Sequence, residues 1–210
     1  MAAFSGLQNR IRNFQSSLLD RVTSRWAAED LQRRADFFVT LFEKDIPAGS
    51  AVLDIGGRWG FYEEPLRRRG HHPVVLDVVL PRYQRAPVVM YDGTEMPFPD
   101  KAFDVSLLIT VLHHIPDQAA VLREACRVTR KRIIVVEDLF NHAAGRLWTE
   151  LRDRLYNFEW VGHPCGFKDA EAWKKFFLGF GLRTVREQAV DTRLCGLNIL
   201  NGIFILELDA

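Results

Sequence analysis

The chain has 210 residues, of which 48% are hydrophobic, and 28 Lys and Arg residues against 27 Asp and Glu residues leave a formal net charge of +1. This content can bury one full core, whereas the balanced charge argues against a nucleic-acid substrate held by a basic field. The three cysteines, Cys126, Cys165 and Cys195, contain no Cys-x-x-Cys pair, which disfavours a disulfide framework and a zinc knuckle. No apolar run reaches about 20 residues and the start lacks a secretion signal, so we expect a soluble, cytoplasmic protein.

Residues 1–46 are predicted to form a helical cap that precedes the sheet. Apolar residues recur every three or four positions from Phe4 to Trp26, and a second helical stretch runs from about Glu29 to Glu43. A cap packed on the core or over a ligand is the favoured interpretation. Peripheral contact with a membrane surface through residues 1–28 is the alternative, because Arg side chains lie between the apolar ones.

Strand and helix patterns alternate after Ser50, which predicts an α/β fold with a mostly parallel, doubly wound sheet. The predicted strands are 51–55, 73–78, 88–91, 103–110, 132–136, 182–190 and 203–208, the last two forming an antiparallel pair at the sheet edge. The predicted helices are 62–69, a helix capped by Asp117 that runs to Val128, 143–156, and 169–180 with Gly181 as its stop.

The run from Ala51 to Gly60, AVLDIGGRWG, ends a buried strand in a glycine-bearing loop that opens a helix. Such a loop is typical of a site for a nucleotide-like cofactor, because helix amide groups point at the ligand. The dinucleotide fingerprint needs glycines at its first, third and sixth positions, and Arg58 and Phe61 occupy the last two. The Gly-Lys-Ser/Thr ending of a phosphate-binding loop is missing too. The loop therefore favours a ligand other than a dinucleotide or a polyphosphate.

Four stretches in order carry a resemblance to a known family: LDIGGRWG at 53–60, VVLD at 74–77, YDGTEMPFPDKAFDV with LLITVLHHI across 91–115, and FKDAEAW through FGL across 167–182. The chain resembles the class I S-adenosylmethionine-dependent methyltransferases, within them the enzymes of ubiquinone and menaquinone biosynthesis. Arg58 departs from the pattern, since a glycine usually stands there. The likeness covers residues 48–210 and implies a Rossmann-like sheet of seven strands that binds S-adenosylmethionine.

The resemblance also implies roles for single residues. Asp77 would hold the cofactor's ribose hydroxyls, and Asp92 would accept a hydrogen bond from the adenine amino group. Asp54 would orient the loop or reach the cofactor's amino group through water, while Gly56 and Gly57 would allow close approach of the methionine portion. The full predicted set of cofactor-binding residues is Asp54, Gly56, Gly57, Gly60, Asp77, Val78, Asp92, Gly93 and Thr110.

Two segments follow from this interpretation, a helical cap at 1–46 and a methyltransferase domain at 47–210 with a lid insertion near 140–168. The run 158–167 is aromatic and rich in turn formers, as in a loop that closes over a ligand. An ordinary connection pinned by its aromatic residues explains the same run equally well.

Methyl transfer from a sulfonium is an in-line displacement, so alignment in a dry pocket supplies much of the rate without a dedicated base. An acceptor that must lose a proton would gain from a general base. The candidates are His114, Asp138, His142 and His163. A ring in the Leu-His-His turn more often packs on the cofactor or caps backbone groups than moves protons. No metal is expected, because no stretch supplies three or four ligands at a familiar spacing.

The predicted function is therefore O-, N- or C-methylation of a small-molecule acceptor, whose identity stays open, as does the oligomeric state. An NAD-dependent oxidoreductase is disfavoured by the failed glycine spacing. A catalytically silent binding or regulatory protein is the second alternative, in which Arg58 and Trp59 crowd the loop. The third is a lipid or quinone methyltransferase at a membrane surface, favoured by the amphipathic start and the aromatic run.

Overall fold

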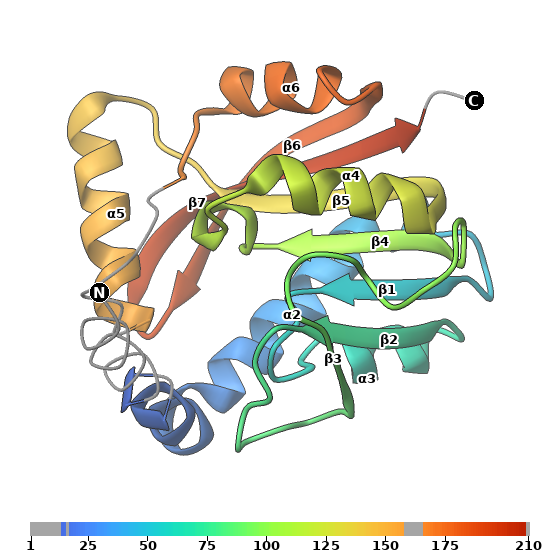
Figure 1. Cartoon of the computed structure of the whole chain (residues 1–210). Coiled ribbons are helices and arrows are strands. Elements are labelled where there is room, and N and C mark those ends of the chain that lie inside the picture. Colours follow the sequence, from blue (N-terminus) through green and yellow to red (C-terminus); the bar gives the residue numbers. More distant parts are fainter. Residues whose placement is uncertain (1–13, 16, 158–165, 209–210) are drawn as a thin grey trace, which may run out of the picture.

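The computed structural model describes residues 14, 15, 17–157 and 166–208. One sheet runs through the molecule in the strand order β3-β2-β1-β4-β5-β7-β6 (Figure 1). Its strands are β1 (Ala51–Ile55), β2 (His72–Asp77), β3 (Val88–Met90), β4 (Phe103–Ile109), β5 (Thr129–Asp138), β6 (Leu182–Leu194) and β7 (Leu197–Leu208). The first five pair in parallel, and β7 pairs antiparallel with both β5 and β6. This confirms the predicted fold, a mostly parallel seven-stranded sheet with an antiparallel pair at its edge.

Helices cover both faces of the sheet. The helices α2 (Ala28–Phe42) and α3 (Glu63–Arg68) pack on one face, where Phe38, Phe42 and Leu66 join the buried cluster. The helices α4 (Gln118–Val128) and α6 (Ala170–Leu178) pack on the other, where Trp173 and Phe177 are fully buried. The helix α5 (Ala143–Asn157) stands apart, beyond the carboxyl ends of the parallel strands, as Figure 1 shows.

The central strands explain why both faces must be covered. Successive side chains of a strand point to opposite faces, so an unbroken apolar run buries both. In β1, Val52 belongs to the cluster under α2 and Leu53 to the cluster under α4, and both are fully buried. β4 repeats the pattern with Leu107 and Leu108. The sheet is therefore the centre of two cores, and its carboxyl edge is left to build a site.

The N-terminal part differs from the prediction of two separate helices. Residues 17–22 are helical and continue through a short π-helix (Thr23–Ala27) directly into α2, without a break. The predicted apolar stripe is only partly buried, because Leu19 is inside whereas Phe14 and Trp26 are exposed. The predicted part from Phe4 to residue 13 lies outside the described residues.

The predicted bounds of four elements, β5, β6, β7 and α6, were wrong. β6 and β7 are longer than expected and meet in a two-residue turn. The two turn residues, Cys195 and Gly196, both have a positive φ, which is typical of a tight two-residue hairpin turn. β5 continues to Asp138, so Glu137 and Asp138 lie inside the strand instead of after it. α6 ends at Leu178 with Gly179 as its cap, before the predicted stop at Gly181.

Candidate active site

A cavity of about 490 Å³ lies at the carboxyl edge of the sheet, where β1, β2 and β4 end. Open parallel sheets bind their ligands at this edge. Of the predicted cofactor residues, seven line the cavity: Asp54, Gly56, Gly57, Asp77, Val78, Gly93 and Thr110. Of the predicted catalytic residues, His114 and Asp138 line it. Gly60, Asp92 and His142 lie outside its lining, and His163 lies outside the described residues.

The loop after β1 has no room for side chains at its glycines. A Cβ atom on Gly57 would lie 2.2 Å from Oδ2 of Asp54, and one on Gly56 would lie 2.3 Å from Cγ2 of Val111. Gly60 serves a different purpose, since its Cβ would meet Ala86 at 2.7 Å, in the segment between β2 and β3. Gly56 and Gly57 therefore bring the backbone of the loop close to Val111 and Asp54, and Gly60 lets the loop pack against the segment that contains Ala86.

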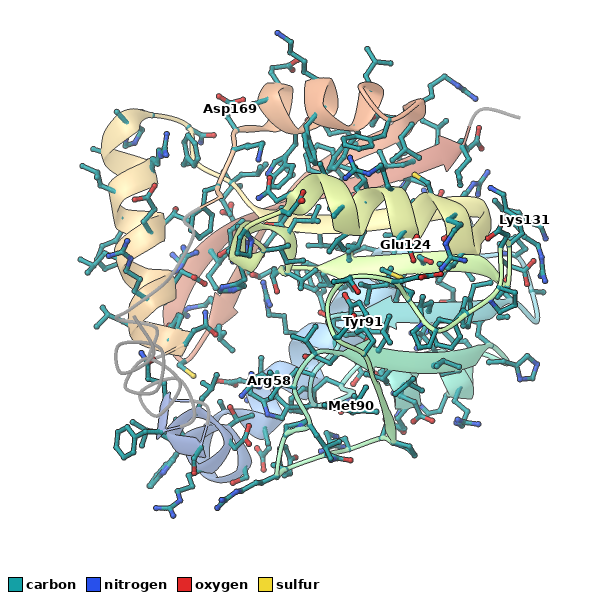
Figure 2. The ribbon with its side chains drawn as sticks, in the orientation of Figure 1. Arg58, Met90, Tyr91, Glu124, Lys131 and Asp169 are labelled. Atoms are coloured by element: carbon teal, nitrogen blue, oxygen red, sulfur yellow. The ribbon has the colours of Figure 1, made fainter. Side chains whose placement is uncertain are left out.

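Arg58, the departure from the family pattern, adopts a positive φ of 38°. A glycine takes this conformation without strain, which explains why glycine is usual there. Figure 2 shows Arg58 between the carboxyl edge of the sheet and the N-terminal helix. Its Nη2 lies 3.3 Å from Oδ1 of Asp20, and the Nε1 of Trp59 donates to the same oxygen at 3.0 Å. The other oxygen of Asp20 accepts from the backbone N–H of Arg82 at 2.9 Å. One buried carboxylate thus fastens the cap to two loops of the site.

Asp77 ends β2 with its carboxylate held by backbone donors. Its Oδ2 accepts from the N–H of Arg58 at 2.9 Å, and its Oδ1 accepts from the N–H of Val79 at 2.8 Å. Burial raises the pKa of Asp77, and these hydrogen bonds oppose the rise. Asp92 differs, because it is exposed and its Oδ1 accepts from the N–H and hydroxyl of Thr94, which lower its pKa.

Asp54 is a deeply buried carboxylate of the site. Its side chain lies under the loop, 2% exposed, and within the described part of the chain its Oδ2 has no hydrogen-bond partner. Burial, together with the negative charge of Asp77, raises the pKa of Asp54 to about 7. Buried polar atoms without partners are rare in folded proteins and mark sites that are completed by a ligand or water.

Asp138 is buried and fully paired, which makes it a weak candidate for a base. Its Oδ2 accepts from the guanidinium of Arg152, and its Oδ1 accepts from Nδ2 of Asn201 at 2.7 Å. Arg34, from α2, lies 3.9 Å from the same Oδ1 and also lines the cavity. Both oxygens of Asp138 are therefore engaged by side chains of the chain itself, and proton abstraction by this carboxylate would disrupt those contacts.

A second polar group lies at the short helix η3 (Leu112–His114). The Nδ1 of His113 lies 2.5 Å from Oε2 of Glu137, and Glu137 also accepts from the N–H of Leu112 at 2.8 Å. Asp153 of α5 faces both imidazoles, 3.5 Å from Nε2 of His113 and 3.8 Å from Nε2 of His114. Burial lowers the pKa of His113, but the charges of Glu137 and Asp153 outweigh it and hold that pKa well above its ordinary value.

The sequence did not indicate several of these residues. Asp153, Arg152 and Arg34 come from helices, and the helical period shows which residues share a face without showing which face meets the cavity. Glu137 directly follows the predicted strand 132–136, and the apolar pattern of that strand assigns no role to the residue after it. His142, by contrast, has a local role, because its Nδ1 accepts from the N–H of Gly145 at the start of α5.

None of the helices in the described part of the chain has the length and apolar character that a bilayer crossing requires.

Comparisons with known proteins agree with this geometry. The sequence profile of a family described as a methyltransferase domain matches residues 26–187. An uncharacterised methyltransferase of Mycobacterium sp. (strain KMS) is 35% identical over 91 residues, which cover 40% of this chain and 36% of the relative. A demethylmenaquinone methyltransferase of Paenarthrobacter aurescens (strain TC1) is 30% identical over 116 residues, which cover 51% of this chain and 45% of the relative. The match thus spans less than half the length of these curated relatives.

A similar solved structure is the 1,6-didemethyltoxoflavin-N1-methyltransferase of Burkholderia thailandensis, determined with 1,6-didemethyltoxoflavin and S-adenosylhomocysteine bound. Its TM-score is 0.66 at 16% identity, and the match covers 98% of this chain and 90% of that one. At this identity the likeness concerns the fold alone. The profile match covers most of the chain, and the chain therefore belongs to the methyltransferase domain family, within the class I S-adenosylmethionine-dependent methyltransferases.

Proposed function

We propose that this protein transfers a methyl group from S-adenosylmethionine to a small-molecule acceptor that loses a proton on methylation. The observation that carries the proposal is one cavity lined by two groups of residues from different elements, which we call its two ends. Its first end is lined by Asp54, Gly57 and Asp77, and its second by His114 and Asp153. The first set matches the family's cofactor motifs, and the second offers an imidazole and a carboxylate to an acceptor.

The first end suits the cofactor chemically. S-adenosylmethionine supplies an activated methyl group on a positively charged sulfur. Asp77 would take the ribose hydroxyls, since its carboxylate has acceptor capacity beyond the two backbone bonds it makes. Asp54 offers a buried oxygen without a partner in the described part of the chain, and Gly57 leaves space beside it. The negative charge of Asp77 and the ionised fraction of Asp54 would favour a cationic ligand.

The second end suits a small, partly apolar acceptor. Ile115, Tyr156, Leu194 and Ile199 line the cavity together with His114. A volume of about 490 Å³ shared with the cofactor leaves space for a compact molecule. A quinol or phenol fits this lining, and the name of the Paenarthrobacter relative supports the same class. His114 would activate the acceptor, because its imidazole lines the cavity whereas His142 lies outside the lining.

Calorimetry with S-adenosylmethionine and S-adenosylhomocysteine tests the first half of this proposal, with one site per chain expected for each. A labelled-methyl assay against small quinols, phenols and amines tests the second half. Binding of S-adenosylmethionine without methyl transfer to a compound of any of these classes would favour the catalytically silent alternative. Absence of cofactor binding in the folded protein would refute the proposal.

The membrane-surface alternative draws support from α5. Leu147, Leu151 and Leu155 lie on one side of this helix with Trp148 beside them, and all four are exposed. Co-sedimentation with vesicles of neutral and anionic phospholipid would compare the full chain with a Leu147→Glu, Leu151→Glu variant. Leu178→Glu is the matched control, because Leu178 is exposed on α6. Loss of binding in the α5 variant alone would support a quinone or lipid acceptor, and no binding by the full chain would exclude this alternative.

A further inference from the structure

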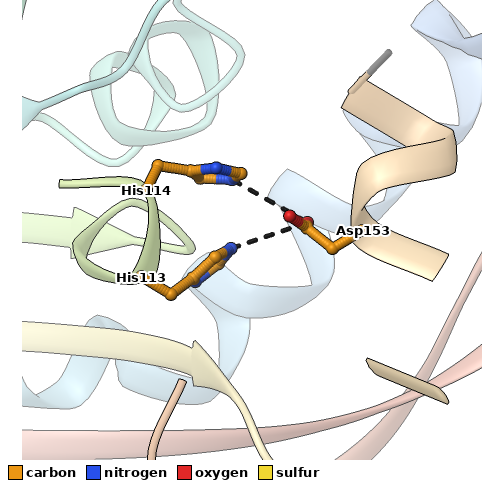
Figure 3. A group of neighbouring side chains, drawn as sticks. All are labelled: His113, His114 and Asp153. Carbon is orange, nitrogen blue, oxygen red and sulfur yellow. Dashed lines mark ion pairs between the residues drawn. The ribbon is translucent and has the colours of Figure 1, made fainter. Parts of the chain in front are cut away.

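Figure 3 shows three side chains that converge from two elements far apart in the sequence, His113 and His114 from η3 and Asp153 from α5. One nitrogen of each imidazole and one oxygen of the carboxylate all lie within 4.8 Å of one another. The Oδ1 of Asp153 lies 3.5 Å from Nε2 of His113 and 3.8 Å from Nε2 of His114. Three ligand atoms of types common in metal sites thus surround one small space.

These separations are long for hydrogen bonds but suit ligands of a common ion. Hydrogen bonds between a charged nitrogen and a carboxylate are about 2.7–2.9 Å long. Two ligands each about 2.1 Å from a tetrahedral ion lie about 3.4 Å from one another. The observed distances of 3.5 and 3.8 Å lie nearer to the second value. A small closing movement would bring the three atoms to bonding distance of one ion.

The surroundings of His113 provide the support that metal-binding imidazoles usually have. Its Nδ1 lies 2.5 Å from Oε2 of Glu137, which leaves Nε2 as the atom on the side of Asp153. Glu137 is fully buried and fixed by the N–H of Leu112, and the ring of Phe167 stacks on His113 at 4.3 Å. A carboxylate behind a ligating histidine sets the ring's orientation and raises its basicity.

The charge of the cluster also favours a cation. Glu137 and Asp153 bring two carboxylates to two imidazoles in a region where three of the four side chains are less than 10% exposed. The nearby guanidinium of Arg152 is already paired with Asp138. The two carboxylates give the cluster a negative charge that would attract a divalent cation.

We propose that His113, His114 and Asp153 bind one divalent transition-metal ion at the acceptor end of the cavity. Two imidazoles and one carboxylate suit zinc, iron(II) or cobalt(II) better than magnesium or calcium, which prefer oxygen ligands. This changes the expectation from the sequence, since the ligands come from the Leu-His-His turn and from a helix 39 residues further on.

The consequence for catalysis rests on the proposed function, whereas the metal site itself does not. His114 and Asp153 line the cavity, so coordination positions left by the protein would face the acceptor. An acceptor hydroxyl bound to the ion would lose its proton at lower pH, and His114 would act as a ligand instead of a base.

The test uses the full chain after removal of metal by a chelator. Titration with cobalt(II) should give visible absorption bands of a protein-bound ion at one equivalent, and calorimetry with zinc should give the same stoichiometry. Asp153→Asn and His113→Asn should weaken zinc binding at least 100-fold. Glu137→Gln should weaken it about 10- to 100-fold, as second-layer carboxylates do. His72→Asn is the matched control, because it removes an exposed imidazole at the opposite end of β2 and should leave zinc affinity unchanged.

S-adenosylmethionine binding, measured on the same samples, shows that each variant is folded and separates the two proposals. Metal binding by the wild type that is lost in Asp153→Asn supports the site, whether or not any acceptor is methylated. Wild-type protein that binds no cobalt or zinc would overturn it, as would an Asp153→Asn variant with wild-type zinc affinity. If His113→Asn does not fold, the comparison of metal binding between the wild type and Asp153→Asn is sufficient to test the site.

Discussion

Substitution of Gly57 by alanine is the sharpest test of the loop after β1. The added Cβ would lie 2.2 Å from Oδ2 and 2.5 Å from Cγ of Asp54, and 2.9 Å from Cγ1 of Val75. Real Cβ atoms are not found below about 3.0 Å from such neighbours. Asp54 has a short side chain and is buried, so the contact cannot be relieved by rotation into solvent. Overpacking of this kind destabilises a protein by about 1–3 kcal/mol.

The measurement is urea unfolding followed by calorimetry with S-adenosylmethionine. With a slope of about 2 kcal/mol per molar urea, a loss of about 2 kcal/mol lowers the midpoint by about 1 M. The displaced Asp54 should also weaken cofactor binding at least tenfold. Gly145→Ala is the control, because its Cβ would meet no atom closer than 3.4 Å and alanine is the better helix former. An unchanged midpoint and an unchanged Kd in Gly57→Ala would refute the steric reasoning.

Three further outcomes are expected. Asp77→Asn should weaken S-adenosylmethionine binding at least tenfold in calorimetry, whereas Asp191→Asn, an exposed change on β6, should not. Asp54, whose pKa is raised to about 7, keeps a proton that the unfolded chain loses near pH 4, so its contribution to stability falls as pH rises through 7. Between pH 5 and pH 8, the free energy of unfolding of Asp54→Asn, measured in urea, should therefore rise by roughly 2–3 kcal/mol relative to that of the wild type. A difference between the two proteins that stays constant with pH would contradict the assignment. Asp20→Ala should lower stability by about 2–4 kcal/mol in the same assay, since a buried carboxylate with three donors is removed.

The parallel part of the sheet was predictable because its strands are short apolar runs bounded by turn formers. Ala51–Ile55 has the observed bounds of β1, and a run buried on both faces has no alternative position in a layered fold. The edge hairpin was harder. Between Val190 and Ile203 the residues are mostly polar or small, and only the pairing of β6 with β7 makes that stretch extended. Strand formation there depends on a partner strand more than on local preference.

The end of the cavity that we propose for the cofactor could be predicted for a topological reason. In a parallel sheet the carboxyl ends of all strands lie at one edge, so residues that follow different strands meet in space. Asp54 and Asp77 line the cavity for this reason, although 22 intervening residues separate them in the sequence. No equivalent rule places a helix that leaves the sheet, and Asp153 therefore remained undetected.

α5 also departs from the usual rule for amphipathic helices, which bury their apolar side. Here Leu147, Leu151 and Leu155 are exposed, while Arg152 and Asp153 are buried. A fold that served stability alone would not turn charged side chains inward, because burial of an ion without a partner is strongly unfavourable. Both charges have partners at the cavity. Arg152 pairs with Asp138, and Asp153 faces the two imidazoles of η3.

The orientation of α5 therefore follows from the site and not from the core. Its charged side lines the end of the cavity that we propose for the acceptor, while residues of β1, β2 and their loops line the end proposed for the cofactor. Arg152 pairs with Asp138, and Asp153 faces the imidazole of His113. We therefore expect substitutions along the charged side of α5 to alter acceptor choice or metal affinity with little effect on cofactor affinity. Asp153→Asn, measured with S-adenosylmethionine and with zinc, compares the two ends in one variant. A large loss of cofactor affinity in this variant would show that the two ends of the cavity are not independent.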